Sequence, residues 1–483
     1  MGVNDKEFVK EVTPRSEDFS QWYLDLVLKT ELMDYAPVKG CMAIRPYGYA
    51  IWENMQRLLD KRIKATGHKN AYFPLFIPES LLQKEAEHVE GFAPEVAMVT
   101  HGGNEKLAER LVVRPTSEAI ICSMYAKWIQ SWRDLPVLIN QWCNVVRWEK
   151  NTRPFLRTSE FLWQEGHTVH STDEEAEEET LKMLGVYKDF VENELAVPVI
   201  SGLKTEKEKF AGALRTYSIE ALMADGKALQ AGTSHNLGQH FAKVFDIQFL
   251  DKDKQLKFAW QTSWGVSTRL IGAVIMVHGD DRGLRLPPQI APIQVMVVPI
   301  ITKKKKEEVL DRARNLLSDF GDTLRIEMDD REEYSPGWKF NEWEMKGVPL
   351  RLEVGPRDLE QGGVSAVRRD TGEKMFIADG ELPLLLPSLL VDIQENLFRQ
   401  ARDFREKNTS RVDSYDQLKE TIQEKRGFVR AFWCGEGRCE EEIKNETKAT
   451  IRCIPFPEGD QETGLCCFCG KQHSKMVYFA RAY

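Results

Sequence analysis

The chain has 483 residues, 42% of them hydrophobic and 29% charged, and its formal net charge is −9. This length and composition predict a globular protein of two to four domains. The longest clean apolar run, residues 270–277, is far too short to span a bilayer, and the first residues lack the apolar stretch of a signal peptide. We therefore expect a cytoplasmic protein without a membrane partner. The negative charge argues against nonspecific nucleic-acid binding, although RNA can still be recognised through unpaired bases.

The first hundred residues predict two helices and an edge strand. Residues 16–33 look helical, and a stronger helix begins at Pro46 and stops at Gly67, because its apolar residues recur at helical spacing. Segment 71–78, AYFPLFIP, is extended but contains prolines, which would remove ladder hydrogen bonds from a central strand. We therefore expect an edge strand that is open to pairing with a partner.

Residues 111–118, LVVRPTSE, predict a strand and a short loop before an apolar helix at 119–132. Thr116 and Glu118 lie in this loop. The simplest role for Thr116 is to cap the helix, with its hydroxyl oxygen accepting a backbone N–H.

A predicted hairpin carries two arginines. Residues 145–149 and 159–163 are rich in β-branched and aromatic side chains, whereas the charged loop between them cannot continue a ladder. Arg147 and Arg157 would then lie on one hairpin, with Glu149 between them. Two planar guanidinium groups on a rigid sheet form a cradle for a polyphosphate and a carboxylate. An Arg-x-Glu pair alone, however, is more often a surface ion pair.

Two later stretches place isolated polar residues among small or apolar ones. The run 228–238, ALQAGTSHNLG, contains Gln230, Thr233 and His235. A lone histidine is more often a structural residue than a ligand. Arg269 begins the apolar helix that follows, and a cation in the first turn of a helix opposes the helix dipole, so its position suggests a nearby anion.

From residue 293 the pattern changes to alternating strands and helices, which predicts a layered α/β domain. The predicted elements are strands at 295–300, 324–327, 349–354 and 364–368 and helices at 304–319 and 388–425.

The last sixty residues predict a metal site. Six of the nine cysteines follow residue 430, and in a reducing compartment such clustering favours a metal over disulfides. Cys434-x4-Cys439 and Cys466-x2-Cys469 have zinc-knuckle spacing, and four thiolates suit a closed structural site. Two surplus cysteines could each replace a member of this set: Cys453 and Cys467.

In chain order, these segments resemble the three motifs of class II aminoacyl-tRNA synthetases and, within them, the archaeal/eukaryotic type of prolyl-tRNA synthetase. Residues 46–78 are similar to motif 1, which forms the dimer interface, the arginine hairpin to motif 2, and residues 262–277 to motif 3. Roughly a hundred residues separate the hairpin from Trp264, which leaves no room for the editing insertion of the bacterial type. The resemblance implies an α+β fold with an antiparallel-sheet catalytic domain over 1–288, an α/β anticodon-binding domain over 289–400 and a small zinc-binding α/β domain over 401–483.

The resemblance also implies site residues. Thr116 and Glu118 would hold the ring nitrogen of proline, and His235 would line its pocket. ATP contacts are implied for Arg147, Glu149, Arg157, Thr158, Gln230, Thr233, Ser267 and Arg269. The catalytic set among these is Arg147, which also binds the proline carboxylate, with Glu149, Arg157 and Arg269. Anticodon contacts are implied for Glu344, Arg351, Arg357 and Lys374, and the carboxylate of Tyr483 would reach back to the active site.

We therefore expect a proline–tRNA ligase. It would activate L-proline with ATP and Mg²⁺ to prolyl-adenylate plus pyrophosphate, and transfer the prolyl group to the 3′ end of tRNA(Pro), as a homodimer with structural Zn²⁺. Three alternatives stay open: a threonyl- or glycyl-type enzyme, a synthetase-like RNA-binding protein without catalysis, and a zinc-dependent nucleic-acid enzyme. Intact motif arginines argue against the second, and four closing cysteines argue against the third.

Overall fold

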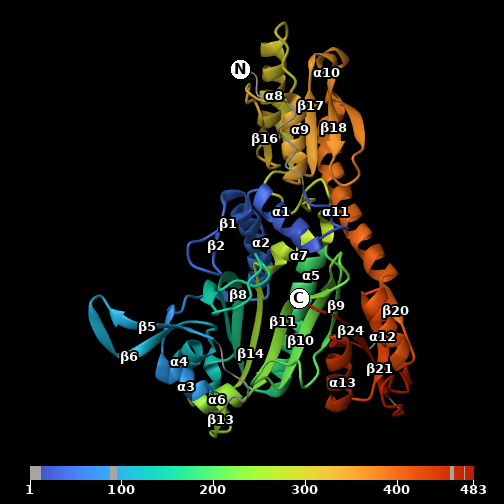
Figure 1. The fold of residues 1–483 in the computed structure, drawn as a ribbon. Coiled ribbons are helices and arrows are strands. Elements are labelled where there is room, and N and C mark those ends of the chain that lie inside the picture. Colours follow the sequence, from blue (N-terminus) through green and yellow to red (C-terminus); the bar gives the residue numbers. More distant parts are fainter. Residues whose placement is uncertain (1–11, 87–94, 457–461, 473) are drawn as a thin grey trace.

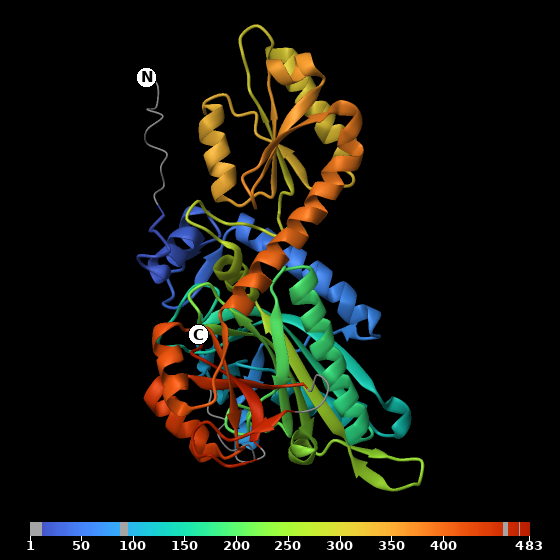
Figure 2. The same ribbon diagram turned by 90° about the vertical axis from the view of Figure 1, so that its right-hand side faces the viewer.

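The computed structural model describes residues 12–86, 95–456, 462–472 and 474–483. Figures 1 and 2 show a central body built on a large sheet, a second layered domain beyond one end of it, and a third domain at its side. The long helix α11 (Leu382–Lys407) runs from the second domain to the third. The expectation about a signal peptide concerns residues that lie outside the described ranges. Within those ranges, no helix has both the length and the apolar character needed to cross a membrane.

The central body contains the predicted arginine hairpin. The strands are β3 (Lys69–Asn70), β7 (Val137–Val146), β8 (Glu160–His170), β9 (Val199–Leu203), β10 (Arg215–Leu222), β11 (Ala228–Gly238) and β14 (Trp260–Ser267). They form the order β9-β10-β11-β14-β8-β7-β3 within a 12-stranded sheet, and only β3 runs parallel to its neighbour in this part. β7 and β8 pair from Val137↔Val169 to Val146↔Glu160. β8 begins where the sequence predicts, but β7 ends at Val146, so Arg147 and Glu149 lie in the loop and not on the strand.

The proline-bearing segment 71–78 is not the single edge strand that the sequence predicts. β3 ends before it, and only β4 (Phe76–Pro78) is extended and paired, in a separate sheet of order β4-β6-β5. Pro74 has no N–H to donate to a ladder, which explains the interruption. The remaining strands of the body are β1 (Met33–Tyr35), β2 (Met42–Ile44), β5 (Ala97–Gly102), β6 (Glu105–Val113), β12 (Gln248–Leu250) and β13 (Leu256–Phe258).

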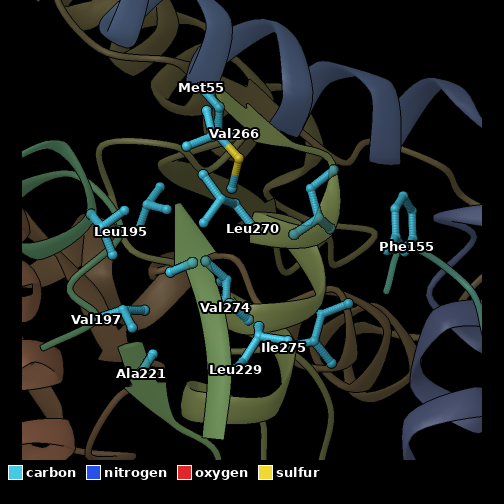
Figure 3. Close-up of a cluster of buried hydrophobic side chains, with 14 of the residues drawn as sticks. Met55, Phe155, Leu195, Val197, Ala221, Leu229, Val266, Leu270, Val274 and Ile275 are labelled. Carbon is cyan, nitrogen blue, oxygen red and sulfur yellow. The ribbon is translucent and has the colours of Figure 1, made fainter. Parts of the chain in front are cut away.

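Helices enclose the core against the central sheet. They are α1 (Phe19–Lys29), α2 (Pro46–Ala65), α3 (Glu79–Ala86), α4 (Glu118–Trp128), α5 (Asp173–Asn193), α6 (His240–Phe245) and α7 (Arg269–His278). α5 packs along β10, β11 and β14 and contacts α2. Figure 3 shows Met55 of α2, Val266 of β14 and Leu270 of α7 in one buried cluster. The core therefore fixes α7, and with it Arg269, against the sheet.

The second domain has the predicted α/β layers with three additions. Its elements are β15 (Val295–Pro299), α8 (Lys306–Phe320), β16 (Ile326–Met328), α9 (Pro336–Met345), β17 (Leu350–Val354), α10 (Pro356–Gln361), β18 (Gly363–Arg368) and β19 (Lys374–Ala378). The sheet order is β16-β15-β17-β18-β19, with β15 parallel to both of its neighbours and the last two strands antiparallel. The sequence did not predict α9, α10 or β19. The predicted helix 388–425 is wrong as one element, because α11 ends at Lys407 and a strand follows.

The third domain continues the central sheet. It comprises β20 (Thr409–Arg411), α12 (Tyr415–Glu424), β21 (Phe428–Trp433), α13 (Gly437–Thr447), β22 (Thr450–Pro455), β23 (Thr463–Gly464) and β24 (Ser474–Ala480). β22 pairs with β9 through Ile454↔Leu203 and Pro455↔Gly202. A buried cluster of ion pairs lies beside this seam, in which Glu220 contacts both Lys204 (2.9 Å) and Arg452 (2.9 Å). The seam joins the two domains by backbone hydrogen bonds and by buried charge.

A glycine on β8 makes room for a large core side chain, which gives a stability prediction. A Cβ at Gly166 would lie 2.1 Å from the ring of Trp264, its partner on β14. We expect Gly166→Ala to lower the free energy of unfolding by about 1–3 kcal/mol, because the tightly packed ring must shift. Gly185→Ala on α5 is the matched control, since its Cβ would meet no atom within 4 Å and alanine favours a helix. Urea unfolding of both variants tests this, and equal stabilities would contradict it.

Candidate functional site

One cavity, of about 300 Å³, gathers the predicted small-molecule residues. It is bounded by the loop between β7 and β8, by β8, β10, β11 and β14, by the loop 204–214, and by the starts of α4 and α7. The predicted residues that line it are Thr116, Glu118, Arg147, Glu149, Arg157, Thr158, Gln230, Thr233, His235, Ser267 and Arg269. Segments more than 100 residues apart in the sequence therefore meet at one site.

Three arginines bring positive charge to this cavity. Arg147 follows β7, and its guanidinium lies 5.5 Å from the ring centre of Phe161 and 5.6 Å from that of Trp163. Its Nε donates to the carbonyl oxygen of Pro115 (3.0 Å). Arg269 at the start of α7 likewise donates from Nε to a backbone carbonyl, that of Leu156 (3.2 Å). Burial lowers the pKa of both arginines, and the neighbouring Arg147 lowers that of Arg269 further. Anions would relieve this repulsion.

Arg157 is placed differently from the other two. Its side chain is 61% exposed, and its Nε donates to Glu149 Oε2 (2.8 Å). The sequence left open a surface ion pair between Arg147 and Glu149. The structure instead pairs Glu149 with Arg157.

Thr116 and Glu118 form the opposite wall. The Thr116 hydroxyl donates to Glu118 Oε2, and both side chains are buried. Thr116 does not cap α4: Ser117 occupies the N-cap position, and its side chain makes no capping bond. The prediction that Thr116 caps the helix is therefore wrong, and both Thr116 and Glu118 line the cavity.

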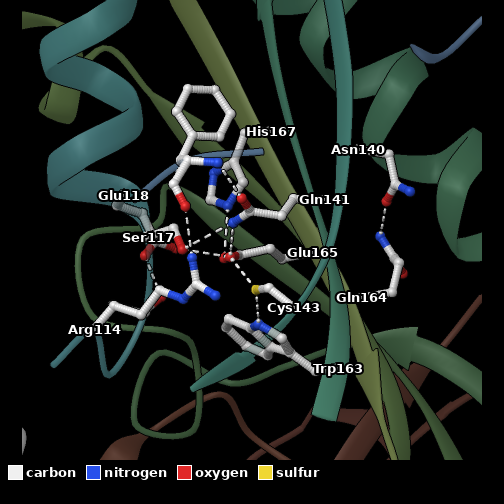
Figure 4. Close-up of polar contacts among 12 residues, drawn as sticks. Arg114, Ser117, Glu118, Asn140, Gln141, Cys143, Trp163, Gln164, Glu165 and His167 are labelled. Carbon is white, nitrogen blue, oxygen red and sulfur yellow. Dashed lines mark hydrogen bonds and ion pairs between the residues drawn. The ribbon is translucent and has the colours of Figure 1, made fainter. Parts of the chain in front are cut away.

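A buried carboxylate at the floor of the cavity escaped the sequence reading. Figure 4 shows Glu165 accepting hydrogen bonds from Ser117, Gln141 (2.9 Å) and His167 (3.0 Å). Burial alone would raise the pKa of Glu165, but these bonds hold it below its usual value. Burial would lower the pKa of His167, but Glu165 raises it above its usual value. Both shifts therefore favour an ionised carboxylate paired with a protonated imidazole.

Alternation along β8 could have revealed this floor. The cavity is also lined by four residues at every second position of the strand: Phe161, Trp163, Glu165 and His167. Successive side chains of a strand point to opposite faces, so these four share one face. Of these four residues, the sequence analysis used only Phe161 and Trp163, as residues that favour a strand.

His235 is neutral and is held from two sides. Its Nδ1 lies 3.0 Å from Thr216 Oγ1, and its ring lies 4.8 Å from that of Phe210. Burial, with the neighbouring His167, lowers the pKa of His235 to about 3. Phe210 belongs to the loop 204–214, a part of the cavity wall that the sequence reading also missed.

The four predicted anticodon residues are only partly brought together. Glu344 and Arg351 line a separate cavity of about 210 Å³. The guanidinium of Arg351 lies 4.2 Å from the ring centre of Phe340. Lys374 joins this group indirectly, because its Nζ (2.6 Å) and Arg351 Nη2 (2.9 Å) both contact Glu353. Arg357, on α10, does not line this cavity.

The four predicted zinc ligands do converge. The Sγ atoms of Cys434, Cys439, Cys466 and Cys469 lie within 4.8 Å of one another. Cys434 Sγ is 3.6 Å from that of Cys439 and 3.7 Å from that of Cys469. These spacings are too long for disulfides, and they fit thiolates about 3.8 Å apart around a tetrahedral Zn²⁺. The surplus cysteines, Cys453 and Cys467, lie outside this cluster.

Tyr483 lies against the central body. Its N–H donates to the carbonyl oxygen of Ala228 (3.1 Å) at the start of β11, and its hydroxyl donates to Asp225 (2.7 Å). Its ring lies 5.2 Å from the guanidinium of Arg153 in the hairpin loop. Tyr483 is not among the residues that line the 300 Å³ cavity. Its ring and hydroxyl lie instead against the hairpin loop and the turn before β11.

Comparisons with known proteins agree along the whole chain. The family description "tRNA synthetase class II core domain (G, H, P, S and T)" matches residues 100–278, "Anticodon binding domain" matches 294–387, and "Prolyl-tRNA synthetase, C-terminal" matches 415–483. The chain is 66% identical to a proline–tRNA ligase of Natranaerobius thermophilus and 62% identical to one of Alkaliphilus oremlandii, over 100% of each chain. A crystal structure of prolyl-tRNA synthetase from Cryptosporidium parvum, complexed with halofuginone and AMPPNP, is 44% identical. It superposes with a TM-score of 0.92 over 98% of this chain and 99% of that one.

The Glu165–His167 pair gives a pH-dependent stability prediction. The raised pKa of His167 stabilises the fold below the unfolded pKa of about 6.5, and this contribution is lost as the pH rises through the folded pKa. The lowered pKa of Glu165 stabilises the fold above about pH 4.5 and is lost in acid. We expect Glu165→Gln to lower the free energy of unfolding by about 3–5 kcal/mol at about pH 5.5, and by less at about pH 9.5.

Glu160→Gln is the control, because it changes an exposed carboxylate on the same strand. Urea unfolding of both variants at the two pH values measures the difference. A loss that is independent of pH, or equal in the two variants, would contradict a charged pair.

Proposed function

The chain belongs to the family of prolyl-tRNA synthetases, and on this basis we propose that the 300 Å³ cavity is its adenylation site. The protein is a proline–tRNA ligase with a class II core, an anticodon-binding domain and a C-terminal domain. We place the domains at 1–288, 289–400 and 401–483, with α11 extending past the second boundary. Membership of this family argues against the three alternatives: a threonyl- or glycyl-type enzyme, a synthetase-like RNA-binding protein without catalysis, and a zinc-dependent nucleic-acid enzyme.

The observation that carries the proposal is the convergence of Arg147 and Arg157, from the β7–β8 hairpin, and Arg269, from the start of α7, on one cavity. Arg147 has a backbone carbonyl and two aromatic rings around it, and burial disfavours its charge unless an anion binds. It is suited to bridge the proline carboxylate and the α-phosphate. Arg157 and Arg269 would hold the β- and γ-phosphates, and the Glu149 carboxylate fixes Arg157.

The opposite wall suits the ring nitrogen of proline. A secondary ammonium has two N–H donors, and the Thr116 hydroxyl and Glu118 carboxylate supply acceptors. Neutral His235 and Phe210 would close the pocket around the ring. Thr158, Gln230, Thr233 and Ser267 would contact the nucleotide from the hairpin, β11 and β14.

Activation requires no general base, because the carboxylate of proline is already ionised and attacks the α-phosphate directly. The barrier comes from repulsion between two anions and from charge that builds on the phosphate oxygens. Guanidinium groups fixed by the sheet lower it by electrostatic preorganisation and alignment. Mg²⁺, which binds ATP chiefly through phosphate oxygens and water, would neutralise further charge on the phosphates. Glu149, beside Arg157, is the carboxylate of this part of the cavity.

In the second step, a terminal ribose hydroxyl of tRNA(Pro) would attack the carbonyl carbon of prolyl-adenylate. The hydroxyl loses its proton, the prolyl ester forms at the 3′ end, and the bond to the α-phosphate breaks so that AMP leaves. Glu344, Arg351, Arg357 and Lys374 are proposed to face the anticodon. Phe340, beside Arg351, offers a surface for stacking, so base edges and aromatic contacts would carry recognition.

Finer assignments rest on further features of the chain. Between β8 and β14 the structure has only α5, α6 and β9–β13, all in the described residues, which supports the archaeal/eukaryotic type without an editing insertion. Exposed Tyr72 (70%) and Phe76 (47%) in the motif 1 segment support a homodimer interface there. The four-cysteine cluster supports a structural Zn²⁺ that cross-links β21, α13 and the turn before β24. A cytoplasmic location is proposed from the enzyme's role.

Removing the central cation gives the kinetic test. We expect Arg147→Ala to lose at least about two decades of proline-dependent pyrophosphate–ATP exchange, the scale for deleting one preorganised donor. Arg110→Ala is the control, because this exposed arginine pairs with Glu79 away from the cavity. Activity of Arg147→Ala within threefold of the wild type would refute the role.

The cysteine cluster gives a test by metal content. Metal analysis of the purified chain should find about one Zn²⁺ per molecule, and Cys469→Ser should hold much less, because one thiolate of four is lost. Cys41→Ser, outside the cluster, should keep the full content. Zinc-free wild type, purified without chelators, would argue against the site.

A further inference from the structure

The loop 204–214, between β9 and β10, forms part of the cavity wall next to His235. The backbone N–H of Phe210 donates to Thr216 Oγ1 (3.0 Å), and the same hydroxyl lies 3.0 Å from His235 Nδ1. The rings of Phe210 and His235 also pack at 4.8 Å. The positions of Phe210 and His235 therefore depend on how this loop is held.

The outer side of the loop is held by the C-terminal domain. Thr205 Oγ1 donates to Glu440 Oε1 of α13 (2.8 Å), and each residue is only 3% exposed. Two exposed ion pairs flank this bond: Lys207 with Glu441 (2.6 Å) and Lys444 with Glu208 (3.3 Å). A buried hydrogen bond to a carboxylate contributes more than exposed pairs do, so the Thr205–Glu440 contact is the main tether.

The start of the loop is anchored at the same seam. Lys204 Nζ donates to Glu220 Oε1 (2.9 Å) and to the carbonyl oxygen of Arg452 (2.8 Å). This ion cluster is buried beside the β9–β22 pairing. These contacts fix the direction in which the chain leaves β9. The Thr205–Glu440 hydrogen bond then fixes the position of the loop that follows.

The tether is also linked to the four-cysteine cluster. Cys439 and Glu440 are neighbours in the first turn of α13. The position of the Cys439 thiolate in the cluster therefore sets the turn that presents the Glu440 carboxylate to Thr205.

We propose that Glu440 is a positioning residue: through Thr205 it holds loop 204–214 against the cavity, so that the C-terminal domain shapes the amino-acid pocket. This rests on the proposed function, because it takes the Phe210–His235 wall as the proline side. The nucleotide side is carried by Arg157, Arg269 and Gln230, on other elements. Loss of the tether should therefore affect proline much more than ATP.

The kinetic test compares variants on both sides of the tether. In proline-dependent pyrophosphate–ATP exchange, we expect Glu440→Ala and Thr205→Val each to raise the KM for proline about tenfold and leave the KM for ATP within about twofold. Glu440→Gln keeps an acceptor oxygen for the Thr205 hydroxyl and should stay near wild type. Glu446→Ala is the matched control, because this carboxylate of the same helix pairs with Lys419 inside the C-terminal domain (2.9 Å).

A second readout is independent of catalysis. Trypsin can cut the loop after Lys207 and Lys209, and cleavage requires local opening. Glu440→Ala, Thr205→Val and wild type treated with a zinc chelator should all be cut there faster than wild type, whereas Glu446→Ala should not. Mass spectrometry of the fragments locates the cuts.

The two readouts separate the possible failures. A proline KM within twofold of wild type in both Glu440→Ala and Thr205→Val, with unchanged cleavage, would overturn the tether. If Glu440→Ala fails to fold, Thr205→Val decides, because it leaves the C-terminal domain intact. Wild type without proline-dependent exchange would overturn the proposed function instead, and the cleavage rates would then decide the tether alone.

Discussion

Burying guanidinium groups without anionic partners costs free energy, and the cavity is organised around that cost. Arg147 and Arg269 are both buried enough for their pKa to fall. The fold compensates them in part, with one backbone carbonyl each and, for Arg147, two aromatic faces. The remaining deficit is what a carboxylate and a triphosphate can fill. The burial of these guanidinium groups therefore destabilises the protein without a ligand and also suits the cavity to bind anions.

The other side of the cavity has the opposite character. Glu118 and Glu165 supply negative charge, and His167 balances Glu165, while His235 stays neutral. A ligand with a cationic nitrogen at one end and anionic groups at the other would match both sides. This polarity is what the proposed function requires of the cavity, with proline at one side, ATP at the other and Arg147 between them.

The sheet makes this arrangement rigid, and it does so beyond the catalytic core. Antiparallel pairing fixes β7, β8, β14 and β11 side by side, and β22 extends the same sheet into the C-terminal domain. The buried Glu220 cluster favours one way of docking the C-terminal domain on the core, because the Glu220 carboxylate is paired only when Lys204 and Arg452 meet there. Through this seam and the proposed Thr205–Glu440 tether, the C-terminal domain would influence the wall of the pocket.

Local chemistry allowed the sequence alone to predict much of this protein. Strand formers around a charged loop predicted the hairpin, Arg269 at a helix start predicted an anion nearby, and thiol spacing predicted the cysteine cluster, since each signal lies within a few residues. Residues placed by long-range packing were beyond it. Alternation along β8 puts Glu165 and His167 on one face with Phe161 and Trp163, but strand pairing decided that this face lines the cavity. Phe210 enters the cavity through the loop after β9, and Thr116 bonds Glu118 and does not cap α4. The tether between Thr205 and Glu440 joins residues 235 positions apart, and only the tertiary structure decided it, because a hydrogen bond between distant segments leaves no pattern in either one.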